Sequence, residues 1–265
     1  MADVIDYKII GDDLQAVIIT LDSGERVIAE AGSMMFMQDG IRMDTTLDPN
    51  DTGGGMVGKL LGGAKRALSG DSFFMTTFTN DARPPRQVAF AAVTPGKVHP
   101  VELKDWGGRI IAQRDAFLCA ARGINVSVAF SKRLGAGFFG GEGFILQRIE
   151  GDGQVFLHAS GTLYEMTLAG GEKVRVDTGC IVAFDDGVDY DIEMVPGVKT
   201  ALFGGEGLFF ATLTGPGRVV LQSMPFSRLA DRIVASAPRL GGQQKGEGGL
   251  GSALGLMGGL LNNND

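Results

Sequence analysis

Three carboxylates are the side chains of this sequence best placed to do chemistry. Asp71, Glu142 and Glu206 each follow glycine and precede an apolar run. If they converged, they would bind a hard cation, or one of them would hold a proton. The interpretation that we favour is that each acid bonds the backbone of a glycine turn or pairs with a nearby basic residue. We therefore predict no catalytic residue and no metal site, and these three acids are the only candidates.

The thiols and imidazoles show no pattern that is typical of a reactive or metal-binding site. Cys119 and Cys180 both lie in apolar runs, which predicts buried and inert thiols. His99 and His158 are far apart in the sequence and lack the spacing of metal ligands. A disulfide framework is also not expected from two cysteines.

One glycine-rich stretch superficially matches a phosphate-binding loop. Residues 53–59 fit the G-x-x-x-x-G-K pattern, but Leu60 stands where a Ser or Thr must bind magnesium. The dinucleotide pattern G-x-G-x-x-G also occurs in the chain, but 42 of the 265 residues are glycine and chance matches are expected. We predict no cofactor.

Composition narrows the class of protein further. The formal net charge is −7, which disfavours nucleic acid as a partner. The many glycines predict tight turns and therefore many short strands. The first residues lack the pattern of a signal peptide, and no apolar run is long enough to span a membrane. We expect a cytoplasmic protein.

Two segments of the chain are similar along their whole length. Residues 140–160 and 204–224 both open with Gly-Gly-Glu-Gly and continue as an apolar run, a glycine turn and a second apolar run. Such runs on either side of a short turn are typical of a β-hairpin. A more divergent copy occupies residues 69–92. We predict a hairpin in each of the three segments.

A second motif recurs in the same order. Residues 21–36, 103–120 and 168–183 each contain a turn, a short strand, a few polar residues and an apolar strand. Two motifs that recur together indicate a module copied along the chain. One copy alone would leave its apolar face exposed. We therefore predict an all-β fold of three internally repeated β-sandwich modules around a pseudo-three-fold axis.

The predicted modules make up one domain, residues 1–225, followed by two further segments. The module boundaries fall near 1–92, 93–160 and 161–225. Residues 226–238 have the apolar periodicity of an amphipathic helix that ends at a proline. Residues 239–265 are glycine-rich and are predicted to form a flexible tail.

An insertion in the first module has a different character. Residues 53–68 combine recurring apolar positions with three basic residues, as in a short basic amphipathic helix. We favour packing of this segment on the protein itself or on another subunit. Contact with an anionic membrane surface is the alternative.

The sequence also resembles a known family. Residues 62–74, the two Gly-Gly-Glu-Gly segments and residues 213–223 are similar to bacterial members of the altered-inheritance-of-mitochondria (mitochondrial biogenesis) protein family. The resemblance extends to about residue 237 and implies an internally duplicated β-sandwich similar to the tryptophan-RNA-attenuation protein. It implies no catalytic residues. Mitochondrial members are associated with inner-membrane organisation, but we see no transit peptide here and do not carry that role over.

Two functions remain open from these observations. The first, which we favour, is a non-enzymatic scaffold or assembly protein, either as a homo-oligomer or with a protein partner. The second is a small-molecule or ion-binding module with a site on the pseudo-three-fold axis, built from Asp71, Glu142 and Glu206. We expect no enzymatic activity in either case.

Overall fold

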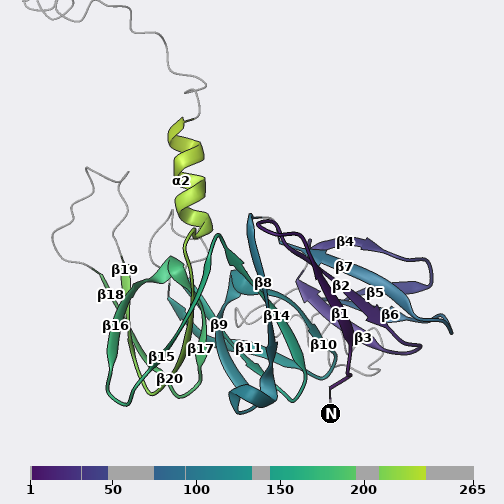
Figure 1. The fold of residues 1–265 in the computed structure, drawn as a ribbon, viewed down its shortest axis with the longest axis horizontal. Coiled ribbons are helices and arrows are strands. Elements are labelled where there is room, and N and C mark those ends of the chain that lie inside the picture. The colour runs from purple at the N-terminus through teal and green to yellow at the C-terminus, as the bar shows by residue number, and fades with distance from the viewer. Residues whose placement is uncertain are drawn as a thin grey trace, which may run out of the picture. The chain divides into compact units, whose positions relative to one another are not determined.

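The computed structural model describes residues 2–30, 32–46, 75–92, 94–132, 144–194 and 209–236 (Figure 1). Strands dominate these residues, and a single α-helix follows them, so the predicted all-β class with a C-terminal helix is confirmed. Within the same ranges no helix has the length and apolarity that crossing a membrane requires. Chain contacts group Met1–Leu229 into one compact unit and Ala230–Asp265 into another.

The strands fall into three consecutive groups, which we call the first, second and third modules. The first module contains β1 (Asp6–Ile10), β2 (Ala16–Leu21), β3 (Arg26–Glu30), β4 (Met34–Met37), β5 (Ile41–Thr46), β6 (Met75–Asn80) and β7 (Arg86–Ala91). The second module contains β8 (Gly96–Glu102), β9 (Arg109–Gln113), β10 (Phe117–Ala121), β11 (Asn125–Lys132), β13 (Phe144–Glu150) and β14 (Gln154–Ser160). The third module contains β15 (Leu163–Leu168), β16 (Lys173–Asp177), β17 (Ile181–Asp185), β18 (Asp189–Met194), β19 (Phe209–Thr214) and β20 (Gly217–Gln222).

Short helices complete the described chain. The 3-10 helices η1 (Leu103–Trp106) and η2 (Arg114–Ala116) belong to the second module, and η3 (Thr178–Cys180) belongs to the third. The predicted C-terminal helix is α2 (Phe226–Ser236), which directly follows the last strand. The predicted segments 53–68 and 239–265 lie outside the described residues.

All three modules pair their strands in one order. One half of each sandwich has the order β2-β7-β4, β8-β14-β10 or β15-β20-β17. The other half has the order β5-β6-β3, β11-β13-β9 or β18-β19-β16. Strands at the same place in these orders are called equivalent below, so that β4, β10 and β17 form one equivalent set and β3, β9 and β16 form another.

Equivalent turns use the same local chemistry. In the first module Asp22–Glu25 connects β2 to β3, with Gly24 at φ 85°. The Glu25 carboxylate accepts a hydrogen bond from the Asp22 amide at 2.7 Å. In the third module Glu172 accepts from the Ala169 amide at 2.8 Å, and Gly171 has φ 78°. A left-handed residue costs little only for glycine, which explains the Gly-Glu pair of both turns.

The predicted hairpins are wrong in their pairing. β13 and β14, which flank the turn Gly151–Gly153, belong to different sheets: β13 pairs with β9 and β11, whereas β14 pairs with β8 and β10. The equivalent strands β6 and β7, and β19 and β20, are likewise in different sheets. Apolar alternation identifies a strand but does not distinguish two strands that pair side by side from two that face each other across a core.

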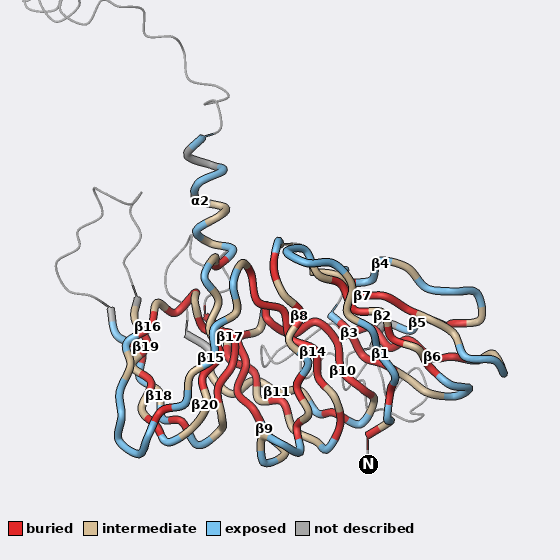
Figure 2. Tube along the Cα trace, in the orientation of Figure 1, coloured by how far each residue is buried: buried red, intermediate tan, exposed pale blue. Residues whose placement is uncertain are grey.

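The two sheets of each module enclose its apolar core. In the first module Phe78 of β6 and Phe90 of β7 meet across the sandwich, with ring centroids 5.2 Å apart and planes at 72°. Both side chains are fully buried. Figure 2 shows the buried positions running along the strands, with exposed residues gathered at turns and outer edges.

Strands join the modules edge to edge. β3 of the first module pairs with β10 of the second, and β9 of the second pairs with β17 of the third, so each junction makes a continuous sheet of 6 strands. No described strand of the first module pairs with a strand of the third. The pseudo-three-fold arrangement therefore stays a prediction, and the described strands connect the modules in chain order.

Candidate functional site

The three predicted carboxylates lie outside the described residues. Asp71, Glu142 and Glu206 fall in the connections between β5 and β6, between β11 and β13, and between β18 and β19. Whether they converge stays a prediction. Within the described part of the chain, no group of three or more His, Cys, Asp or Glu side chains is arranged to hold a metal ion.

The predicted burial in an apolar strand is confirmed for Cys119 and is wrong for Cys180, which lies in η3 and is only partly buried. Cys119 in β10 is fully buried, and burial raises the pKa of its thiol well above the ordinary value. Cys180 in η3 is half-buried, and its pKa is raised mainly by burial and further by Asp177, against the lowering effect of Arg228. Both thiols are therefore protonated at neutral pH and are poor nucleophiles.

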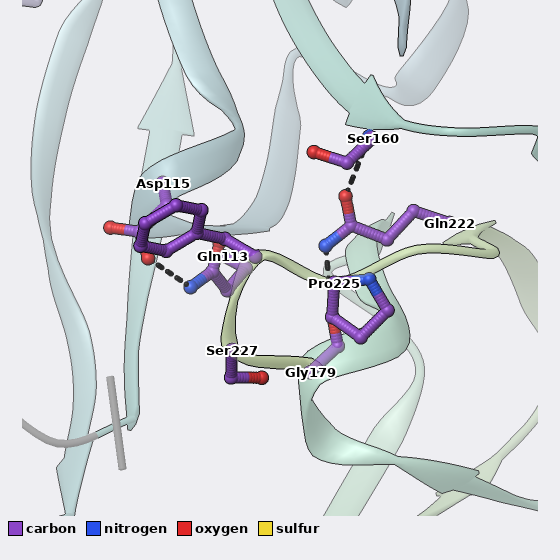
Figure 3. Close-up of a pocket in the computed structure, with 8 residues that line it drawn as sticks. Gln113, Asp115, Ser160, Gly179, Gln222, Pro225 and Ser227 are labelled. Carbon is purple, nitrogen blue, oxygen red and sulfur yellow. Dashed lines mark hydrogen bonds between the residues drawn. The ribbon is translucent and has the colours of Figure 1, made fainter. Parts of the chain in front are cut away.

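A small polar cavity lies where η2, η3 and the turn before α2 meet (Figure 3). The Gln222 side chain spans its wall, accepting a hydrogen bond from the Ser160 amide at 2.8 Å and donating one to the Gly179 carbonyl at 2.8 Å. Gln113 donates to the Asp115 carboxylate at 3.1 Å. The two bonds of Gln222 tie β20 to β14 and to η3, whereas the Gln113 bond stays within the segment of β9 and η2.

The size of this cavity limits what it can bind. Its volume is about 30 Å³, which is room for roughly two water molecules. Typical small-molecule sites enclose roughly 300 Å³ or more. We interpret the cavity as a water-sized space at the contact between the second and third modules.

Asp115 also faces a carboxyl group of the first module. Glu30 ends β3 near Arg114 and Asp115, and its pKa is raised from 4.5 to about 7. Burial among the surrounding protein atoms is the largest cause, the negative charge of Asp115 adds to it, and Arg114 opposes it. Glu30 is nevertheless exposed to solvent at the end of β3, and screening by water makes its energetic effect much smaller than full burial would give.

This pKa predicts a pH-dependent stability. Between about pH 4.5 and 7 the folded chain binds more protons at Glu30 than the unfolded chain, so this group makes the fold less stable as pH rises. Replacing Glu30 with Gln should raise the melting temperature at pH 8 by roughly 1–3 °C and leave it unchanged at pH 4. Melting curves of both proteins from pH 4 to 8 test this, with exposed Glu193→Gln as the control. If the melting temperatures of Glu30→Gln and the wild type differed by the same amount at every pH, the prediction would be contradicted.

At the opposite end of the junction between the second and third modules, charged side chains form ion pairs. Arg109 of β9 lies 3.1 Å from Asp186, which follows β17, and 2.5 Å from Glu150. Arg148 of β13 also lies 3.3 Å from Asp186. Because each of these cations already has an acidic partner, the group clamps two modules together and leaves no open anion site.

The most distinctive surface feature is the strand β4. Its sequence is Met-Met-Phe-Met, and three of its side chains are exposed: Met34 at 37%, Met35 at 50% and Met37 at 40%. The equivalent strand β10 is buried along its whole length, and four of the five residues of β17 are buried. Within the described residues β4 pairs only with β7, whereas β10 and β17 each have a second neighbour from the preceding module.

The three equivalent strands also share an irregularity. Each carries a register shift at the same place: between Met34 and Phe36 in β4, between Phe117 and Cys119 in β10, and between Ile181 and Ala183 in β17. β4 is therefore built in the same way as the two strands that form module junctions. The apolar run of β4 is recognisable in the sequence as a repeated strand, but no residue in it indicates that this copy is exposed.

The fold and this edge define a class: a protein of β-sandwich modules joined by their edge strands, with one apolar strand, β4, that no described strand pairs with on its outer edge. Comparison with known proteins identifies the family. The family model described as "Mitochondrial biogenesis AIM24" matches residues 7–224, and the chain belongs to this family. The predicted resemblance is thus confirmed.

Two relatives from Streptococcus pyogenes are similar over most of the chain. An uncharacterised protein of serotype M6 is 30% identical over 222 residues, which cover 83% of this chain and 86% of the relative. A crystal structure of a protein from the same species has a TM-score of 0.69 at 24% identity, covering 88% of this chain and 100% of that one. This second likeness is one of fold.

Proposed function

We propose that this protein is a non-enzymatic scaffold or assembly protein, and that β4 is an interaction edge. The single observation that carries the proposal is the exposure of Met34, Met35 and Met37 on a strand whose equivalents are buried in module junctions. Exposed apolar residues on an unpaired edge strand favour the addition of a partner strand.

The module junctions indicate what stabilises a partner strand on β4. In β10 and β17 the position equivalent to Met37 is buried and pairs with a strand of the preceding module, and the positions equivalent to Met34 and Met35 are buried next to that pairing. Burying apolar surface contributes about 25 cal/mol per Å². Methionine side chains also adapt to partners of different shape, which suits a binding surface. Among the described residues, neither the small polar cavity nor the two protonated thiols offers a site for catalysis.

A substitution on the edge tests this function. Met35→Lys in the full-length protein should weaken self-assembly or partner binding by at least about tenfold, because a desolvated ammonium would replace an apolar contact. The measurement is light scattering after size-exclusion chromatography, together with titration of any partner that copurifies with the wild type. Tyr164→Lys is the matched control, since Tyr164 is 57% exposed on β15.

Two results would overturn the proposal. One is a wild-type protein that stays strictly monomeric and binds no protein partner. The other is an assembly that tolerates Met35→Lys as well as it tolerates Tyr164→Lys.

A further inference from the structure

Among the described strands, two lack the neighbour that their equivalents have. β10 and β17 each pair on their outer edge with β3 or β9 of the preceding module. β4 belongs to the first of the described modules, and among the described strands it pairs only with β7. β16, the equivalent of β3 and β9, belongs to the last module and pairs only with β19 among the described strands. The two open edges are thus the two halves of one kind of junction.

We propose that β16 of one copy pairs with β4 of a second copy, antiparallel and head to tail, in the register of the two junctions inside the chain. The proposal deepens the proposed assembly function by naming the partner as a second copy of this chain. It rests on that function, because both require β4 to bind another strand.

The register can be derived from the pairs that the chain already makes. On β4, β10 and β17, the residues Met37, Ala120 and Phe184 occupy one position, because each is the second residue after the register shift. In the two internal junctions this position faces an isoleucine: Ala120 pairs with Ile28, and Phe184 pairs with Ile111.

The equivalent of these isoleucines on β16 is Arg175. It is the third residue of its strand, as Ile28 is in β3 and Ile111 is in β9. Its strand neighbour confirms the position, since Arg175 pairs with Thr212 of β19 just as Ile28 pairs with Thr77 of β6. The proposed junction therefore pairs Arg175 of one copy with Met37 of the next, and the arginine stem can pack on the methionine.

Charged residues two positions along each strand from Arg175 and Met37 support this register. Two residues away from the pair Ile111–Phe184, Arg109 and Asp186 form a 3.1 Å ion pair across the junction of the second and third modules. The same step from Arg175 and Met37 leads to Lys173 on β16 and Asp39 after β4, both exposed. A cation and an anion thus occupy these two positions in the proposed junction, as they do in the junction of the second and third modules, whereas the junction of the first and second modules places Arg26 opposite Arg122.

The charged edge of β16 also explains selectivity. Lys173 and Arg175 are exposed on β16, and charged side chains on an edge strand discourage pairing with unrelated strands. β4 offers the acid Asp39 opposite Lys173 and places apolar methionines along the rest of the strand. The contact joins two different surfaces of the same chain, so its repetition forms a closed ring or a filament.

A disulfide across the proposed junction tests the register. Paired residues of an antiparallel ladder have Cα atoms roughly 4.5–5.5 Å apart, within the span of a disulfide. The full-length variant Met37→Cys with Arg175→Cys should form chain-to-chain disulfides under mild oxidation, seen as a ladder on a non-reducing gel. The matched control is Met37→Cys with Lys173→Cys, whose diagonal separation is roughly 7–8 Å. We expect at least about fivefold more cross-linked chain in the first variant.

Charge exchange tests the same junction without new cysteines. Lys173→Asp or Asp39→Lys alone should weaken self-association by about three- to tenfold, because like charges would then face each other. The variant with both changes should recover association close to wild type. Because Lys173 and Asp39 are both exposed, we expect each variant to fold normally. A melting curve of each variant checks this.

The possible outcomes separate this inference from the function on which it rests. Equal cross-linking in both cysteine variants, or no recovery in the double charge exchange, would overturn the pairing of β16 with β4. If the pairing failed these tests but Met35→Lys abolished the binding of a different protein, β4 would remain an interaction edge. The second copy would then be excluded as its partner. A monomer with no partner at all would overturn both proposals.

Discussion

Replacing Phe184 with alanine should lower the free energy of unfolding by about 3–5 kcal/mol. Phe184 lies in β17, where its side chain is fully buried in the core of the third module. Its ring lies 5.5 Å from the ring of Tyr190, so the substitution removes an aromatic contact as well as apolar volume. The sheets on either side are held by their ladders and cannot collapse fully into the space.

Thermal and urea unfolding of the full-length protein measure this loss. For a chain of this size the melting temperature should fall by roughly 6–20 °C. Tyr164→Ala is the control, because Tyr164 is 57% exposed on β15 of the same module and its truncation should change the melting temperature little. Equal changes in the two variants would show that the packing described for the third module is wrong.

Replacing Gly96 with alanine should destabilise the fold by about 2–3 kcal/mol. Gly96 begins β8 and pairs with Ser160 of β14. An added Cβ would collide with the Ala159 carbonyl oxygen and would lie 2.8 Å from the Ser160 Cα. Both are backbone atoms, and the Gly96 carbonyl also accepts a hydrogen bond from the Gln15 amide at 3.0 Å. The strand therefore has no side chain that could move aside.

A second glycine provides the matched comparison. Gly170 precedes the turn glycine of the third module, has nothing within 4 Å of an added Cβ and does not have a left-handed backbone. Gly170→Ala should leave the stability unchanged or raise it by up to about 1 kcal/mol, because alanine restricts the unfolded chain. If both variants unfolded at the same denaturant concentration, the close contact of β8 with β14 would be contradicted.

Much of the fold could be predicted because its signals are local. Glycines at positive φ, such as Gly24 and Gly171, mark the turns, and apolar alternation marks the strands between them. The buried state of Cys119 could also be predicted from the apolar run around it. In each case the neighbours along the chain already contain the physical cause.

The pairing of strands could not be predicted in the same way. The turn Gly151–Gly153 looked like the tip of a hairpin, but β13 and β14 face each other from different sheets. The local sequence is compatible with both arrangements. The choice depends on β9 and β8, which take up the ladder positions next to these two strands.

The sequence by itself determined an all-β chain with repeated glycine turns and apolar strands, because backbone conformation and alternation are properties of neighbouring residues. Only the tertiary structure decided which copy of an apolar strand is exposed. Met35 and Leu118 occupy equivalent strands, yet Met35 is 50% exposed and Leu118 is 2% exposed. Leu118 lies next to the residues of β10 that pair with β3 of another module, whereas no described strand pairs with that edge of β4. Contact between modules likewise sets part of the pKa of Glu30, through Asp115 of the second module.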